Sequence, residues 1–369
     1  MILYVLKHGE APVIDTVDFA VLSTEDVLTQ SVVEVTETSL YTRGVPTTNG
    51  LNDLRMGTVD RRLRCSTCGE SVNQCPGHMG HIRLPWPCYH IHFVETTLKA
   101  LRCVCFFCSR VNLNESDIRS ASRLKGKLRF THVHNTCKSR KKCTHCGAHQ
   151  PAFSRSATGI KCDWVATKFE SEEEASYCMS AFTARHAKSI LSCVPTDDLK
   201  LMGFMSSHPK DFIMEVVVVA PPVARPAVMA SEGSRARGQD DLTLKLMDIL
   251  RRCVEINQYS SSTGIVCPRV LDERDNVDEE MADKLSKLQL EVYSFMNSNV
   301  KPPKRPGSKS TTVVKSLGDR LRGKEGRIAH KHFVQHHAER PPIALTLIAS
   351  LEQYFGCHVV SRTDGRPHH

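Results

Sequence analysis

Two groups of cysteine and histidine residues have the spacing of metal ligands. The first group is Cys65, Cys68, Cys75 and His78, in which a Cys-x-x-Cys pair is followed by the run Cys-Pro-Gly-His. Two such pairs can close a tetrahedron around one ion, which leaves no coordination position open for a substrate. Thiolate and imidazole ligands suit Zn²⁺ better than a hard cation. The group therefore predicts a structural zinc site, in which Gly77 lets the backbone turn sharply before His78.

The second group consists of two Cys-x-x-Cys pairs that lie far apart in the sequence. Its members are Cys105, Cys108, Cys143 and Cys146. We interpret residues 109–142 between the pairs as a basic loop whose base is held by a second zinc ion. Cys103 and Cys137 are alternative ligands, but the Cys-x-x-Cys spacing favours Cys105 over Cys103.

Composition indicates that these cysteines stay reduced. The chain has 369 residues, of which 40% are hydrophobic and 24% are charged, so it is long enough for about two or three domains. Its first residues include a Lys, a His and a Glu too early for a signal peptide, and no long uncharged apolar run follows. We therefore expect no membrane association and a reducing compartment, where clustered cysteines indicate metal ligands rather than disulfides. The formal net charge of +9 only weakly indicates a polyanionic partner.

The elements that must position these ligands are expected to be mixed helices and strands. Residues 17–35 begin with an apolar, strand-like run, and Ser23 and Asp26 then form a capping pair for a short helix. Residues 215–220 have the composition of a strand that ends at two prolines.

Two longer helices are expected further along the chain. The first begins at Asp240 or Asp241, and the second spans residues 279–296, because apolar residues recur on one face of each. These apolar faces are interpreted as core contacts or as contacts between the two helices.

Residues 297–328 form a basic segment that is broken by Pro and Gly. Between residues 301 and 327, only Asp319 and Glu325 oppose the many Lys and Arg side chains. Such charge density favours contact with a phosphate backbone over base reading, and the alternative is a solvated linker. The candidates for phosphate contact are Arg320, Arg322, Lys324 and Arg327.

Several motifs resemble the amino-terminal clamp of the largest subunit of multisubunit DNA-directed RNA polymerases. The resemblance begins with GTVDRRLRCSTCGESVNQCPGHMGHIRLPWPCYHIHF and continues through LRCVCFFCS and CGAHQP. It extends in the same order to DLKLMGF, HPKDFIMEVVVVAPPVARP, RGQDDLTLKLMDIL and RPGSKSTTVVKSLGDRLRGKEGRI. The similarity covers about Val17 to Ile328, and the motifs resemble those of eukaryotic nuclear or large-DNA-virus polymerases.

This resemblance implies an α+β fold, namely a multidomain clamp with two small structural zinc modules and a helical clamp region. The expected segments are 1–60 as an amino-terminal clamp core segment, 61–162 as the zinc-binding clamp region, 163–300 as the clamp head with a lid-like loop and two helices, 301–328 as a rudder-like and switch-like basic segment, and 329–369 as an unrelated tail.

The resemblance also implies roles for individual residues. In that family two structural zinc ions belong to the clamp, which closes over the DNA cleft, and the two cysteine groups match their ligands. Residues 231–239 match the lid, so Arg235 and Arg237 are candidates for contact with RNA or template. The segment 301–327 matches the rudder and the start of a switch that contacts template phosphates.

The implied activity is nucleotidyl transfer by an assembly rather than by this chain alone. The implied partners are the DNA template, the RNA–DNA hybrid, the second-largest and smaller polymerase subunits, and the remainder of the largest subunit if that is encoded separately. In the complete polymerase, magnesium is held by an Asp-Phe-Asp-Gly-Asp run, which does not occur here, so we expect the isolated chain to be inactive. The expected location is the nucleus, or for a viral protein the host nucleus, the cytoplasmic virus factory and the virion.

The resemblance stops abruptly after the run GKEGRI. Residues 329–369 read differently, and our hypothesis is that they come from a frameshift, an unspliced intron or a split gene. Two alternatives to the polymerase function therefore stay open: a stand-alone, zinc-dependent nucleic-acid-binding or scaffold protein, and a non-functional truncated product.

Overall fold

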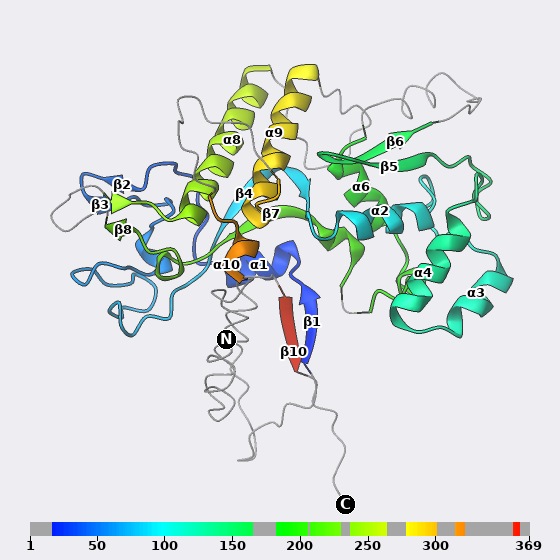
Figure 1. Cartoon of the computed structure of the whole chain (residues 1–369), viewed down its shortest axis with the longest axis horizontal. Helices are drawn as coiled ribbons and strands as arrows, with labels where there is room; N and C mark the ends of the chain where they lie inside the picture. The colour runs from blue at the N-terminus through cyan, green and yellow to red at the C-terminus, as the bar shows by residue number, and fades with distance from the viewer. Residues whose placement is uncertain are drawn as a thin grey trace, which may run out of the picture.

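A central pair of strands joins the parts of the molecule (Figure 1). The computed structural model describes residues 17–164, 182–205, 207–229, 237–263, 278–300, 314–321 and 357–361. Within these ranges helices and two-stranded antiparallel sheets are mixed along the chain. The α+β prediction is therefore confirmed.

The central pair consists of β4 (Gly80–Tyr89) and β7 (Ile213–Val219), which run antiparallel. Valines fill β7 because β-branched side chains suit an extended backbone. The register shifts between Arg83 and Cys88, where two prolines of β4 remove backbone donors from the ladder. The strand predicted at 215–220 is confirmed, although β7 begins two residues earlier and ends one residue earlier.

The helical hairpin consists of α8 (Asp241–Thr263) and α9 (Glu279–Met296), which pack on β4 and project to one side of it (Figure 1). Both predicted helices are confirmed. A carboxylate oxygen of Asp240 accepts a hydrogen bond from the backbone N–H of Leu242 at 3.0 Å and so caps α8. The predicted apolar stripes meet in one core. Its fully buried members include Leu246, Ile249, Leu288 and Val292.

A second core lies at one end of the molecule, where several helices lie on one side of a short hairpin (Figure 1). The helices are α2 (Val94–Cys103), α3 (Glu115–Ser122), α4 (Gly126–Cys137), α6 (Ala184–Ser192) and α7 (Thr196–Met202), and the strands are β5 (Ala152–Ser156) and β6 (Gly159–Asp163). The predicted basic loop at 109–142 is therefore wrong, because α3 and α4 occupy most of it. Both helices bury only a few small or apolar side chains, so their sequence lacks a broad apolar stripe.

The amino-terminal region confirms the predicted strand and capping pair. Strand β1 (Val17–Val21) precedes α1 (Thr24–Gln30), and Ser23 and Asp26 form a reciprocal capping box at the start of α1. Strand β10 (Cys357–Ser361), which belongs to the predicted unrelated tail, pairs antiparallel with β1.

The remaining elements are short and mostly join the larger ones. They are β2 (Tyr41–Thr42), β3 (Val45–Pro46), η1 (Leu54–Met56), η2 (Pro209–Phe212), η3 (Pro222–Ala224), β8 (Val228–Met229), β9 (Arg237–Gly238) and α10 (Leu317–Leu321). No helix in the described ranges combines the length and the apolar character that crossing a membrane requires.

Candidate metal centres

The first predicted ligand group converges in the structure. One ligand atom from each of Cys65, Cys68, Cys75 and His78 lies within 4.8 Å of the others. The group is built by two turns: the amide of Gly69 donates to the carbonyl of Cys65 at 2.9 Å, and the amide of His78 donates to Met56 at 3.0 Å. The imidazole Nε2 of His78 lies 3.7 Å from the sulfur of Cys75.

Glycine conformation is required at the second of these turns. Gly77 has a φ of +85°, and a Cβ built on it would lie 2.7 Å from Cγ of Pro221, two residues after the end of β7. The amide of Gly77 also lies 3.4 Å from the sulfur of Cys75. The predicted role of Gly77 in the sharp turn before His78 is therefore confirmed.

The second predicted group also converges, although its two halves are far apart in the sequence. Its members Cys105, Cys108, Cys143 and Cys146 each place a sulfur within 4.8 Å of the others. The sulfurs of Cys105 and Cys146 are 3.6 Å apart, and those of Cys108 and Cys143 are 3.7 Å apart.

Three of the Cys-x-x-Cys turns share one backbone design. The residue after the second cysteine has a positive φ in each: Gly69 at 75°, Ser109 at 53° and Gly147 at 75°. In each turn the amide of this residue donates to the carbonyl of the first cysteine, at 2.9 to 3.1 Å. This shared turn aims both sulfurs of a pair at the same point, as one ion requires.

The spacing of the sulfurs fits a tetrahedral zinc site. A Zn–S bond of about 2.3 Å places the corners of a tetrahedron about 3.8 Å apart. The printed sulfur separations of 3.6 and 3.7 Å are close to that edge. The two groups could therefore each hold a metal ion, with four soft or borderline ligands and no carboxylate among them.

Burial raises the pKa of these thiols, whereas hydrogen bonds from backbone amides lower it. Burial raises the pKa of Cys75 to about 12 and the pKa of Cys105 to about 12. Burial also acts to raise the pKa of Cys65 and Cys143, but hydrogen bonds from backbone amides and from neighbouring cysteine side chains together outweigh it, so both pKa values are lowered. A bound cation would favour the thiolate form of all these groups, because metal binding displaces the thiol protons.

The alternative ligands lie outside both groups. Cys103 is buried, donates a hydrogen bond to the carbonyl of Lys99 at 3.0 Å and interacts with Cys137. His81, three residues after His78, also lies outside the first group and bonds through Nδ1 to the hydroxyl of Ser31 at 2.8 Å. The choice of Cys105 over Cys103 agrees with this geometry.

Two polar residues that the sequence did not indicate support the second group. The amide group of Gln150 donates to the sulfur of Cys105 at 3.2 Å and accepts from the backbone of Phe106 at 2.8 Å. Asn112 donates to the carbonyl of Lys142 at 3.1 Å and accepts from the amide of Thr144 at 2.9 Å. No spacing rule could have identified them, because each lies outside the Cys-x-x-Cys pairs.

The predicted nucleic-acid contacts are only partly within the described ranges. Arg320, in α10, forms an ion pair with Asp240, the residue that caps α8. Arg237 is described only as part of the backbone of β9. The other four candidates lie outside the described residues: Arg235, Arg322, Lys324 and Arg327.

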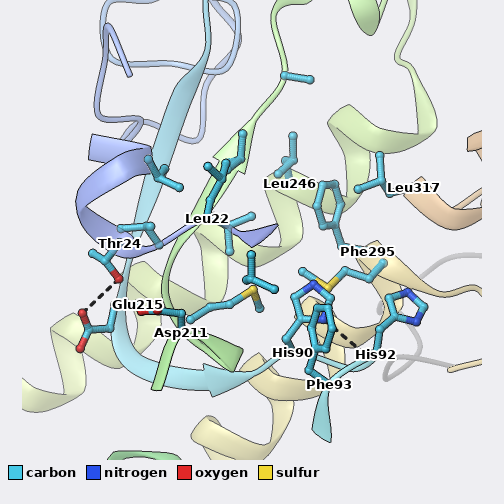
Figure 2. A pocket seen from close by; sticks show the side chains of 18 of the residues that line it. Leu22, Thr24, His90, His92, Phe93, Asp211, Glu215, Leu246, Phe295 and Leu317 are labelled. Carbon is cyan, nitrogen blue, oxygen red and sulfur yellow. Dashed lines mark hydrogen bonds between the residues drawn. The ribbon is translucent and has the colours of Figure 1, made fainter. Parts of the chain in front are cut away.

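A cavity of about 320 Å³ lies beside β7 and is mostly apolar (Figure 2). Its carboxylates, Asp211 and Glu215, lie on the other side of the view from His90 and His92. Glu215 is already paired with Lys188 at 2.8 Å, and burial raises the pKa of Asp211. The apolar lining of the cavity favours a packing role.

Comparison with known proteins identifies the family. The family described as RNA polymerase Rpb1, domain 1, matches residues 12–331, which include both metal groups. The chain is 32% identical over 330 residues to DNA-directed RNA polymerase subunit Rpo1N of Thermococcus celer, which covers 85% of this chain and 34% of that protein. It is 30% identical over 328 residues to DNA-directed RNA polymerase II subunit RPB1 of Euplotoides octocarinatus, which covers 85% of this chain and 65% of that protein.

The extent of these matches agrees with the resemblance seen in the motifs. The chain spans about a third of the length of one relative and less than two thirds of the other. The family match ends at residue 331, within a few residues of the predicted change of sequence after Ile328. The chain belongs to the family of RNA polymerase Rpb1, domain 1, the amino-terminal region of the largest subunit of DNA-directed RNA polymerase.

Proposed function

We propose that this chain acts as the clamp portion of a DNA-directed RNA polymerase, which holds the DNA template and the RNA–DNA hybrid while other parts of the assembly carry out nucleotidyl transfer. The observation that carries this proposal is the continuous family match over residues 12–331, with both metal groups inside it. In this function the chain acts where transcription takes place, which is the nucleus for a eukaryotic cellular protein.

The two metal groups are proposed to hold structural zinc. Each group supplies four ligands, so zinc would be fully coordinated by protein and would stabilise the fold rather than bind substrate. The first ion would join the loop after η1 to the end of β7 through Gly77 and Pro221. The second would join the end of α2 to the segment after α4, across an excursion of more than thirty residues.

The basic candidates are proposed to serve nucleic-acid binding in two ways: one anchors a helix, and the others contact the nucleic acid. Arg320 is paired with Asp240 and is suited to anchor α10 against the start of α8. Arg322, Lys324 and Arg327 directly follow α10 in the sequence, so this anchor would fix where a phosphate-binding segment begins. Arg235 and Arg237 are proposed for the lid, where they would contact RNA or template.

Purification of the chain from its native source through an amino-terminal tag tests this function. We expect the second-largest and smaller polymerase subunits to copurify, together with about two zinc ions per chain. The recovered complex should synthesise RNA from a DNA template only when magnesium is present. Recovery of the chain without any other polymerase subunit would contradict the proposal.

A further inference from the structure

A second strongly basic segment lies outside the segment 301–327. Eleven Lys and Arg residues and no Asp or Glu occur between residues 118 and 162. Because the formal net charge of the whole chain is +9, all the other residues together carry a formal charge of −2. This segment contains the last five residues of α3, all of α4 and one half of the second metal group, and Glu115 and Asp117 of α3 lie just before it.

The structure uses two of these cations to hold the segment together. The guanidinium of Arg129 donates to the carbonyl of Leu124 at 2.7 Å and to that of Lys200 at 3.1 Å. The guanidinium of Arg140, after α4, pairs with Asp117 of α3 at 2.5 Å. These contacts hold α3, α4 and α7 in fixed positions relative to one another, and most of the remaining cations lie on or beside α3 and α4 and in the linker to Cys143.

The remaining cations of the two helices and the linker to Cys143 are exposed to solvent. We name them the basic hairpin surface: Arg119, Arg123, Lys125, Lys127, Lys138, Lys141 and Lys142. No carboxylate in the described ranges forms an ion pair with any of them. The packed helices also carry four carboxylates: Glu115 and Asp117 of α3, and Asp197 and Asp198 of α7. Three of them are paired with other cations, namely Asp117 with Arg140, Asp197 with Lys200 and Asp198 with Arg110. Within the part of the chain that the structure describes, the surface thus carries positive charge without a paired carboxylate.

The arrangement fits a duplex backbone better than a single strand. Single-stranded nucleic acid is held largely by stacking on exposed aromatic rings. The two Phe residues of residues 118–162 are turned inward: Phe130 packs against Phe204, and Phe153 is buried. Helix α4 has 12 residues and is therefore about 18 Å long, a length over which a duplex carries on the order of ten phosphates.

We propose that the basic hairpin surface binds the phosphate backbone of double-stranded nucleic acid, without reading its sequence. This inference rests on the proposed function and adds to it a second contact surface, separate from the lid-like loop and from the segment 301–327. The second metal group would hold one end of this surface in place, since Lys142 directly precedes Cys143.

The test measures binding of the full chain to a fluorescent DNA duplex by anisotropy, with KCl varied between about 50 and 200 mM. The variant carries Arg123→Gln, Lys127→Gln and Lys138→Gln. The matched control removes three cations that are paired with carboxylates elsewhere, Arg62→Gln, Arg251→Gln and Lys287→Gln. A third variant, Arg123→Lys, Lys127→Arg and Lys138→Arg, keeps the charge.

We expect the first variant to bind about tenfold or more weakly at about 100 mM KCl, with a salt slope shallower by about 2 to 3. The control and the charge-keeping variant should bind like the unaltered chain. The same anisotropy measurement is made with a single-stranded DNA and with an acidic polypeptide as probes. The proposal would be overturned if the variant and the control lost duplex affinity equally. It would also be overturned if the variant lost affinity only for the single strand or only for the polypeptide. If the unaltered chain itself binds no duplex, the proposed clamp function fails as well, whereas unchanged binding in the variant overturns only the surface.

Discussion

Cys103 and Cys105 lie two residues apart, but their sulfurs have different surroundings. The sulfur of Cys105 belongs to the second metal group, 3.6 Å from that of Cys146. The sulfur of Cys103 lies outside this group and interacts with Cys137 and with the carbonyl of Lys99. The pKa of Cys103 is raised by its interaction with Cys137 and by burial, and the pKa of Cys105 is also raised by burial, so the position of the sulfur rather than its pKa separates the two cysteines.

Replacement of each of these two cysteines by serine separates the two roles. We expect Cys105→Ser to reduce bound zinc from about two ions per chain to about one, because a four-ligand site loses a thiolate. Cys103→Ser should keep both ions, since a hydroxyl can still donate to the carbonyl of Lys99. Zinc per chain, measured by atomic emission after dialysis, checks this. Loss of an ion in Cys103→Ser alone would reverse the assignment.

Gln150 provides a test of the contacts around a ligand. Its side-chain amide donates to the sulfur of Cys105, and loss of such a partner commonly weakens a metal site about 10- to 100-fold. We expect Gln150→Ala to release zinc to a competing chelator at a correspondingly lower chelator concentration. The control is Gln74→Ala, because Gln74 bonds to Ser71 and lies in the loop of the first group. Equal release by both variants would contradict a role for Gln150.

The convergence of each cysteine group could be predicted because its signal is local. Two residues between paired cysteines are enough to aim both sulfurs at one ion, whatever the rest of the chain does. Gln150 could not be predicted in the same way. Its contact with Cys105 spans 45 residues and depends on how the second half of the group returns to the first.

Among the helices and strands, prediction succeeded where burial is periodic. Helix α9 has the predicted bounds, because its apolar side chains recur on one face and Asp278 caps it through the amide of Met281. Helices α3 and α4 were missed because their exposed faces carry the cations, and they bury few side chains. Their capping and ion-pair contacts, such as Arg140 with Asp117, become visible only in three dimensions. The pairing of β10 with β1 joins distant ends of the chain, which periodicity cannot indicate.

Gly77 lies where the first metal group packs against Pro221 after β7, so replacement of Gly77 tests this packing. A Cβ at Gly77 would meet Pro221 at 2.7 Å, whereas one at Gly69 would meet nothing within 4 Å, although both residues have a positive φ. We expect Gly69→Ala to lower the free energy of unfolding by about 1 to 2 kcal/mol through backbone strain alone. Gly77→Ala should lower it by about 1 to 3 kcal/mol more, because the side chain also overpacks the junction.

Urea unfolding measures the free energy of unfolding of both alanine variants. Zinc is kept in excess so that the metal groups stay occupied. The difference between the two alanine variants isolates the steric contribution of Pro221, since both share the backbone strain. An equal loss in both would show that the junction between the first metal group and β7 can relax around the new side chain.

At the scale of the whole molecule, the fold buries His81 and His134 and partly buries His90 and His208. Burial lowers the pKa of His81, His90, His134 and His208, and that of His90 falls to about 3. Each of these groups binds a proton less readily in the folded chain than in the unfolded chain. Their combined effect couples the stability of the molecule to pH.

The direction of this coupling follows from where the protons bind. Unfolded histidine takes up a proton as the pH falls through about 6.5, whereas folded His90 stays neutral until the pH approaches its much lower pKa. Acidification therefore favours the unfolded chain below pH of about 6.5. The pKa values of some carboxylates, such as Asp53 and Asp319, are lowered from the ordinary value of 3.8. Protonation of these groups therefore reduces the free energy of unfolding only at lower pH.

We expect the free energy of unfolding to fall steadily from pH of about 7 to about 5.5, and to fall less steeply in His90→Asn. Asparagine can still accept the hydrogen bond that the amide of His92 donates to Nδ1 of His90 at 3.3 Å, so the change mainly removes the titrating group. Urea unfolding at several pH values with zinc in excess provides the comparison. Protonation of the metal ligands contributes to both curves and cancels in their difference, so parallel curves would mean that His90 does not couple folding to pH.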